Sequence, residues 1–242
     1  MKLSILLNRL DKLLQVLYSV NLLRALVMHG VLAGAEHRSI LRPDLATVID
    51  TGANRGQFSL AIRRWAPNAK VFAFEPLSEP AARFRKVFQS DSNVILHQVA
   101  IGTESGVSTI HVSAADDSSS LLPISQVQVS LFPGTGEVRT EMIKVGRLAD
   151  FVSVKEISGP AMLKLDVQGF ELNVLQGCED LLECFLYVYA ECSFVELYTG
   201  QALADEVIAW LRARGFRLIG VYHMGYDRNG RAVQGDFLFE RL

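Results

Sequence analysis

A glycine-containing loop between a predicted strand and a predicted helix constrains the fold of this chain more than any other feature. Residues 47–50 form a β-branched run that ends in Asp50, and residues 57–65 follow with the spacing of an amphipathic helix. Between them lies the pattern Asp50-x-Gly52-x-Asn54-x-Gly56. Glycine and asparagine tolerate positive φ angles, and a glycine lets a ligand approach the backbone closely. The loop therefore predicts a ligand site where a strand of an α/β sheet meets its helix.

Strands and helices are expected to alternate along the rest of the chain. The further predicted strands are 70–74, 94–101, 163–166, 185–190, 216–222 and 236–240, and the predicted helices between them are 79–88, 170–182 and 202–214. Alternation with short turns is typical of a mainly parallel, Rossmann-like sheet that binds ligands beyond the carboxyl ends of its strands. A turn signal at 226–230 precedes the last strand, so we expect the sheet to close with an antiparallel C-terminal hairpin.

Residues 103–146 differ in character from the rest of the predicted domain. Residues 107–112 and 138–145 alternate between apolar and polar side chains, as antiparallel strands do. We expect a β insertion at the edge of the sheet, where loops that contact substrate are common. The predicted organisation is an N-terminal helical appendage over residues 1–42 and a Rossmann-like domain over 43–242.

The N-terminal segment is rich in leucine without having the pattern of a membrane span. Charged side chains at 9, 11, 12 and 24 leave no uncharged stretch of roughly 18 residues, the length a membrane span needs. The apolar residues recur at three- and four-residue steps from Leu3 to Val20. This spacing predicts an amphipathic helix with a broad apolar stripe. Packing on its own domain or on a second copy of the chain is the favoured interpretation, and peripheral contact with a membrane surface is the alternative.

Composition limits the partners of the chain. Half of the 242 residues are hydrophobic and the formal net charge is −2, which indicates a folded protein and no nucleic-acid partner. The cysteines are odd in number and form no C-x-x-C pair; they are Cys178, Cys184 and Cys192. A disulfide framework or a zinc site is therefore not expected, and we predict a cytoplasmic protein.

An acidic residue at the end of the second predicted strand extends the loop site. Glu75 lies 25 residues after Asp50, where its carboxylate can accept both hydroxyls of a ribose. NAD enzymes share this arrangement, but their G-x-G-x-x-G pattern is absent, and Asp50 would repel a pyrophosphate. Asp50 can instead orient the amino group of a methionine moiety, through water or directly, which favours S-adenosylmethionine over NAD. Ala100, near the end of the third predicted strand, is expected to line the same site.

Several motifs in order resemble one family. They are 48–56 (VIDTGANRG), 73–76 (AFEP), 119–121 (SSL), 163–171 (LKLDVQGFE), 174–177 (VLQG) and 236–239 (DFLF). The chain resembles the FkbM family of methyltransferases from about residue 45 to residue 242. The resemblance implies a class I methyltransferase fold, S-adenosylmethionine as the cofactor, and O-methylation of sugars or secondary metabolites. It carries over five cofactor-binding positions: Asp50, Gly52, Asn54, Gly56 and Glu75.

The chain departs from the family pattern at two places. Gln168 stands where the family commonly has Glu, so a second carboxylate is missing beside Asp166. The first forty residues lie outside the resemblance, which therefore offers no explanation of the leucine-rich helix.

Two carboxylates are candidates for activating the methyl acceptor. Asp166 and Glu191 follow predicted strands that we expect to be neighbours, and a strand spacing of roughly 4.8 Å brings both within reach of one proton or one divalent cation. A hydroxyl is a poor nucleophile at neutral pH and needs a base or a metal ion. We predict that Asp166 is the base or metal-proximal carboxylate and that Glu191 supports it. The alternative is that Asp166 caps the next helix and Glu191 faces solvent.

Other polar side chains are candidates for the acceptor side of the site. His223 is predicted to lie in a loop with two tyrosines after a strand, from which it could close over an acceptor. In the insertion, the candidates for substrate contact are Asp116, Asp117 and Ser119.

The predicted function is therefore O-methylation of a sugar or small-molecule hydroxyl. One rival is an N-methyltransferase, which needs less help from a base because a neutral amine is already nucleophilic. The other is a binding or assembly module that has kept the nucleotide fold without turnover and uses the leucine-rich helix as its interaction surface.

Overall fold

The computed structural model describes residues 19–242. Most of the leucine-rich helix predicted over residues 3–20 lies outside this range, and its predicted contacts with the domain, a second copy or a membrane remain predictions. Within the described range, none of the helices has the length and apolar character needed to span a membrane.

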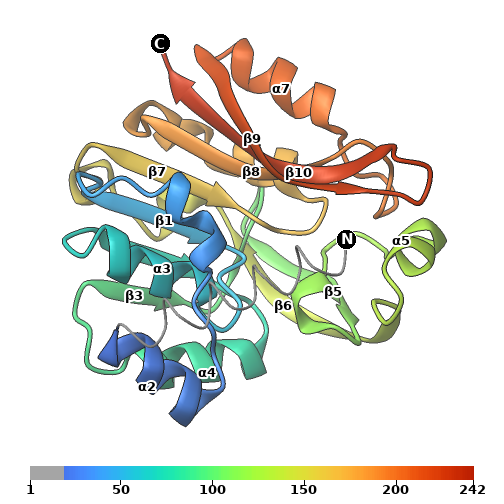
Figure 1. The fold of residues 1–242 in the computed structure, drawn as a ribbon. Helices are drawn as coiled ribbons and strands as arrows, with labels where there is room; N and C mark the ends of the chain where they lie inside the picture. Colours follow the sequence, from blue (N-terminus) through green and yellow to red (C-terminus); the bar gives the residue numbers. More distant parts are fainter. Residues whose placement is uncertain (1–18) are drawn as a thin grey trace.

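A seven-stranded sheet forms the centre of the molecule (Figure 1). Its order is β3-β2-β1-β7-β8-β10-β9, with the first five strands parallel and β10 antiparallel to both of its neighbours. The strands are β1 (Thr47–Thr51), β2 (Lys70–Phe74), β3 (Val94–His97), β7 (Ala161–Leu165), β8 (Tyr187–Ser193), β9 (Phe216–Tyr226) and β10 (Ala232–Arg241). The predicted α/β class and the antiparallel C-terminal hairpin are confirmed.

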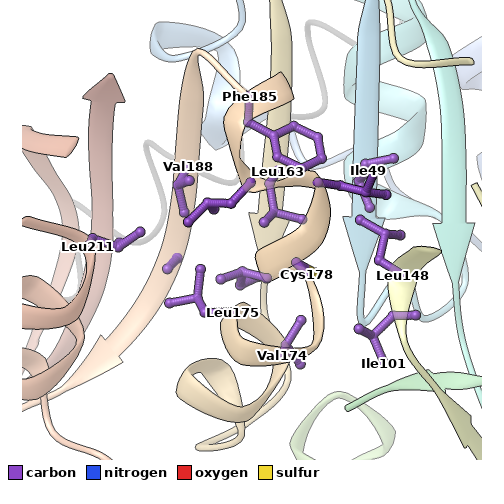
Figure 2. Packing of buried hydrophobic residues seen from close by; sticks show 14 of the residues in the cluster. Ile49, Ile101, Leu148, Leu163, Val174, Leu175, Cys178, Phe185, Val188 and Leu211 are labelled. Carbon is purple, nitrogen blue, oxygen red and sulfur yellow. The ribbon is translucent and has the colours of Figure 1, made fainter. Parts of the chain in front are cut away.

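Helices cover both faces of this sheet. They are α2 (Val20–His29), α3 (Gln57–Trp65), α4 (Ser78–Phe88), α6 (Glu171–Gly177) and α7 (Ala204–Arg212), with short 3-10 segments at η1 (Ala35–Ser39), η3 (Leu148–Asp150), η4 (Val154–Glu156) and η5 (Glu179–Cys184). One face of β1 and β7 packs against α6 and α7, and Figure 2 shows Ile49, Leu163 and Leu175 within this cluster. The opposite face packs against α3 through Val48 and Ile62. Apolar residues on both faces of the central strands explain why these runs are almost continuously hydrophobic.

The insertion forms a second, smaller sheet beside the first (Figure 1). Its order is β4-β6-β5, with β4 (Ala100–Ile101), β5 (Gly106–Ser113) and β6 (Glu137–Gly146), and the segment between β5 and β6 contains η2 (Asp116–Ser118) and α5 (Gln126–Leu131). β5 and β6 are antiparallel, as the alternation predicts. The single strand predicted over 94–101 is wrong, because the chain leaves the main sheet after His97 and re-pairs at Ala100 with β6 of the small sheet.

The segment before β1 packs directly on the domain. Leu22 and Val31 share an apolar cluster with Leu60 of α3 and Phe84 of α4. The backbone N–H of Gly34 donates to the backbone oxygen of Gln57 at 2.8 Å. This contact holds η1 beside the N-terminus of α3, at the end of the sheet where the glycine loop lies.

Candidate active site

A cavity of about 270 Å³ lies at the carboxyl ends of the parallel strands. This volume is close to the lower end of small-molecule sites, roughly 300 Å³. Its walls come from η1, the β1–α3 loop, the ends of β2 and β7, β4 and the insertion. Of the nine residues predicted to be catalytic or cofactor-binding, five line it: Gly52, Asn54, Glu75, Ala100 and Asp166. The other four, Asp50, Gly56, Glu191 and His223, lie outside the lining.

The predicted loop adopts the backbone that its residue types favour. Gly52, Asn54 and Gly56 have φ angles of 72°, 47° and 97°. A Cβ on Gly52 would lie 1.8 Å from the backbone oxygen of Asp166. At position 52, glycine is therefore required both by the left-handed backbone and by the close approach of the next strand end.

Glu75 holds the loop from the end of β2. Its carboxylate accepts hydrogen bonds from the backbone N–H of Asn54 at 2.9 Å and of Leu77 at 2.8 Å. Burial raises the pKa of Glu75 to about 7. Each carboxylate oxygen keeps lone-pair capacity for a ligand hydroxyl, and the side chain lies on the cavity wall.

Asp50 lies behind the cavity lining, in an ion pair with the lining residue Lys164 that the sequence analysis missed. Its carboxylate is fully buried, accepts a hydrogen bond from Ser59 Oγ at 2.7 Å, and lies 3.0 Å from Lys164 Nζ. Burial alone would lower the pKa of Lys164, but the carboxylates of Asp50 and Asp166 raise it above its usual value. Direct contact between Asp50 and a ligand is therefore not the geometry observed. The sequence does carry a signal for this ion pair: Lys164 is a single lysine within the apolar run of β7, and a buried charge needs a partner of opposite charge.

Two buried amide oxygens on the cavity wall have no hydrogen-bond donor. They are Oδ1 of Asn54 and Oε1 of Gln57. Buried polar atoms are nearly always hydrogen-bonded in folded proteins. These two oxygens therefore indicate where a donor group of a ligand would bind.

Asp166 and Glu191 lie on neighbouring strands, as expected, but an amide group joins them. β7 and β8 are paired, and Gln168 Nε2 donates to Asp166 Oδ1 and to Glu191 Oε2, both at 2.8 Å. Tyr198 donates its hydroxyl hydrogen to Gln168 Oε1 at 2.7 Å, which fixes the amide with its nitrogen toward the carboxylates. A cation needs oxygen ligands turned toward it, whereas a donor occupies this position. The side chains around Asp166 and Glu191 therefore do not fit the divalent ion considered from the sequence.

The structural alternatives for the two carboxylates are not observed. Asp166 makes no helix cap; Glu171 instead accepts from the backbone N–H groups of Val167 and Gly169 at 3.1 and 3.2 Å. Glu191 is half-buried and accepts hydrogen bonds from Gln168 and Gln234, and burial together with the nearby carboxylates raises its pKa well above the usual value.

His223 lies within β9 and not in the predicted loop. Tyr222 pairs with Asp236 and Gly225 pairs with Gln234, so a β-bulge at His223 interrupts the ladder. Its φ angle is 46°, and its Nδ1 lies 2.7 Å from Asp236 Oδ2. The hydrogen bond to Asp236 raises the pKa of His223.

His37 is a cavity residue that the sequence analysis missed entirely. It comes from η1, and its Nδ1 lies 3.0 Å from the hydroxyl oxygen of Tyr189. Burial lowers the pKa of His37. Nothing in the local sequence singles out this residue, because only the packing of η1 against α3 brings it to the site.

The insertion contributes polar groups to the cavity wall. Asp117, Ser119 and Ser120 line the cavity, and Ser120 Oγ donates to the backbone oxygen of Gln168 at 2.6 Å. The insertion is thereby attached to the turn that follows β7.

The sequence of this chain is similar to those of known methyltransferases. The methyltransferase FkbM domain matches residues 50–218. The 2-O-methyltransferase NoeI of Sinorhizobium fredii (strain NBRC 101917 / NGR234) is 29% identical over 217 residues, which cover 84% of this chain and 83% of that protein. The 31-O-demethyl-FK506 methyltransferase FkbM of Streptomyces tacrolimicus is 30% identical over 214 residues, 76% of each chain.

A solved structure shows the same fold. The crystal structure of methyltransferase FkbM from Methylobacillus flagellatus KT matches with a TM-score of 0.53 at 13% identity, over 80% of this chain and 44% of that one. The match of the domain over most of the chain identifies the protein: it belongs to the FkbM family of S-adenosylmethionine-dependent methyltransferases.

Proposed function

We propose that this protein transfers the methyl group of S-adenosylmethionine to a hydroxyl oxygen of a sugar or another small-molecule metabolite. The observation that carries the proposal is the single cavity that joins the glycine loop and Glu75 to the carboxylate of Asp166. The names of two relatives, a 2-O-methyltransferase and a 31-O-demethyl-FK506 methyltransferase, support oxygen as the acceptor atom.

The cofactor end of the cavity fits S-adenosylmethionine. Glu75 would accept hydrogen bonds from the ribose hydroxyls, and the unpartnered oxygens of Asn54 and Gln57 would accept from the methionine ammonium group. Gly52 leaves room for the cofactor to lie against the loop backbone, and Ala100 would contribute to the same cofactor site. The bound cofactor supplies a methyl group on a positively charged sulfur.

Cofactor affinity is expected to fall as the pH decreases through about 7, the pKa to which burial raises Glu75. The ionised carboxylate accepts the ribose hydrogen bonds, so binding requires loss of the proton that Glu75 holds at low pH. Affinity for S-adenosylhomocysteine should be constant above this pKa and should decrease by roughly tenfold for each pH unit below it. Calorimetric titration across this range measures the effect.

Glu75→Gln is the matched control, because it keeps the shape of the side chain without its ionisation. This variant should bind S-adenosylhomocysteine more weakly than the unsubstituted protein at high pH. Its affinity should also lose the dependence on pH that the ionisation of Glu75 causes. An affinity of the unsubstituted protein that stays level through pH 7 would contradict the role of Glu75.

At the acceptor end, Asp166 is proposed to take the hydroxyl proton as the oxygen attacks the methyl carbon. The bond between oxygen and methyl forms while the bond between sulfur and methyl breaks, and the positive charge on sulfur disappears. Gln168 holds Asp166 through its 2.8 Å hydrogen bond, and Glu191 in turn holds Gln168. The apolar walls formed by Phe58 and Phe170 help to exclude water.

Asp166→Asn is expected to lower turnover by roughly 10²–10⁴-fold, the usual contribution of a positioned base. Affinity for S-adenosylhomocysteine should change by no more than about twofold, because the loss is confined to the transition state. Turnover is measured as S-adenosylhomocysteine released with a set of mono- and oligosaccharides and hydroxylated small molecules, with mass spectrometry locating the added methyl group. Asp205→Asn, an exposed carboxylate in the first turn of α7, is the control.

The competing functions give different results in this assay. Methylation of amines with no sensitivity to Asp166→Asn would replace the proposal with N-methylation. Tight cofactor binding with no methyl transfer to any acceptor of the set would favour the binding module.

A further inference from the structure

Three side chains with metal-binding chemistry converge beside the cavity. His37, His223 and Asp236 each offer one ligand atom, and these atoms all lie within 4.8 Å of one another. His223 and Asp236 come from the paired strands β9 and β10, and His37 comes from η1, which is far from them in the sequence. His37 also lines the cavity, so the cluster borders the proposed site.

We propose that His37, His223 and Asp236 bind one divalent transition-metal ion. Two imidazoles and one carboxylate suit zinc, cobalt, nickel or iron(II), whereas magnesium and calcium prefer oxygen ligands alone. At bond lengths of 2.0–2.2 Å a tetrahedral metal holds its ligand atoms about 3.3–3.6 Å apart. The ligand atoms lie within 4.8 Å of one another, so rotations of the three side chains that close the widest separation by at most roughly 1.5 Å suffice.

The backbone of β9 is distorted at His223, and the distortion brings this side chain to the cluster. The positive φ of His223 is uncommon for a residue with a side chain, and it occurs at the β-bulge that turns His223 toward Asp236. Strain of this kind persists where the surrounding structure maintains it, and it is concentrated at functional sites. The β-bulge and the positive φ at His223 are therefore explained if this position must place the imidazole as a metal ligand.

Tyr189 supplies the outer contacts that metal ligands usually have. Its hydroxyl donates to Asp236 Oδ2 at 2.7 Å and lies 3.0 Å from His37 Nδ1. Outer partners of this type orient carboxylate and imidazole ligands. The hydroxyl therefore links ligands contributed by two separate elements, η1 and β10.

The geometry separates this cluster from the pair Asp166 and Glu191. The amide nitrogen of Gln168 fills the space between those two carboxylates with a donor. At the histidine cluster the contact between His223 Nδ1 and Asp236 Oδ2 is 2.7 Å, and a metal ion would replace the proton that these atoms share.

A metal ion held by three protein ligands would keep at least one free coordination position. Because His37 lines the cavity, a molecule in the cavity could reach that position. A hydroxyl or water oxygen bound there would lose its proton more easily, as at catalytic metal sites. This role in activating the acceptor rests on the proposed function, whereas metal binding itself does not.

The test uses the untagged, full-length chain after treatment with a chelator and dialysis. Titration with Co²⁺, followed by visible absorption, and with Zn²⁺, followed by calorimetry, should give one equivalent. His37→Ala and His223→Ala should each weaken binding by at least roughly 100-fold, and Tyr189→Phe by roughly 10–100-fold, as outer-ligand changes do. A far-UV circular dichroism spectrum and a urea midpoint close to those of the unsubstituted protein show that each variant is folded.

His111→Ala is the matched control, because His111 Nδ1 lies 2.7 Å from Glu137 Oε2, the same distance as in the His223 pair. It should leave metal binding unchanged. Three outcomes would overturn the proposal: no stoichiometric binding of either ion, binding that survives both His37→Ala and His223→Ala, or binding that disappears only with Asp166→Asn. Because the titration involves no acceptor, failure of the proposed methylation would leave its result intact.

Discussion

Lys164→Met is expected to lower the free energy of unfolding by about 3–5 kcal/mol, the usual cost of leaving one member of a buried ion pair alone. The Lys164 side chain is 5% exposed, Asp50 is completely buried, and their charged atoms are 3.0 Å apart. Methionine fills a similar volume but leaves the Asp50 carboxylate without its cation. Urea denaturation at neutral pH measures the loss.

Two further variants identify the cause. Adding Asp50→Asn to Lys164→Met removes the unpaired charge and should recover more than half of the loss, since replacing both members of a buried pair is far less costly than removing one. Lys70→Met makes the same substitution at an exposed ion pair, 3.6 Å from Glu156, and should cost no more than about 1 kcal/mol. A Lys164→Met protein as stable as the Lys70→Met protein would refute the role of the buried pair.

Gly52→Ala is expected to abolish measurable cofactor binding and to destabilise the fold. A methyl group at position 52 would lie 1.8 Å from the backbone oxygen of Asp166 at a φ of 72°. The left-handed backbone costs about 1–2 kcal/mol with a side chain, and displacing a packed backbone adds about 1–3 kcal/mol. Either the loop or the end of β7 must move, and both line the cavity. Calorimetry with S-adenosylhomocysteine and urea denaturation record the two effects.

Gly230→Ala separates the steric effect from the backbone effect. Gly230 has a similar φ of 79°, and nothing lies within 4 Å of the position of its Cβ. This variant should lose only the 1–2 kcal/mol of left-handed strain and should bind the cofactor normally. Equal behaviour of the two variants would mean that the contact with Asp166 is unimportant.

The glycine loop and the position of Glu75 beside it could be predicted from sequence because their determinants are local. Gly52, Asn54 and Gly56 lie within one turn, and each has the positive φ that its residue type permits. Glu75 follows β2, and the rule that parallel strands end at one edge of the sheet places it beside that turn. The same rule made Asp166 and Glu191 neighbours.

The partners of these residues could not be predicted in the same way. Asp50 satisfies the expected pattern, but its carboxylate pairs with Lys164 and does not line the cavity. Which way a carboxylate points at the end of a strand depends on its rotamer and on the charges packed around it. Gln168 looked like a departure from the family pattern, and only its contacts reveal that its amide joins Asp166 to Glu191.

By itself, the sequence determined the α/β class, the parallel sheet with its C-terminal hairpin, and the position of the cofactor loop, because periodicity and turn chemistry act over a few neighbouring residues. The tertiary structure alone decided what surrounds the acceptor end. His37 and Tyr189 are 152 positions apart and become neighbours only when η1 packs on α3. The bulge that aims His223 at Asp236 depends on the register of two paired strands. Contacts of this kind arise from packing between distant segments, which no local pattern encodes.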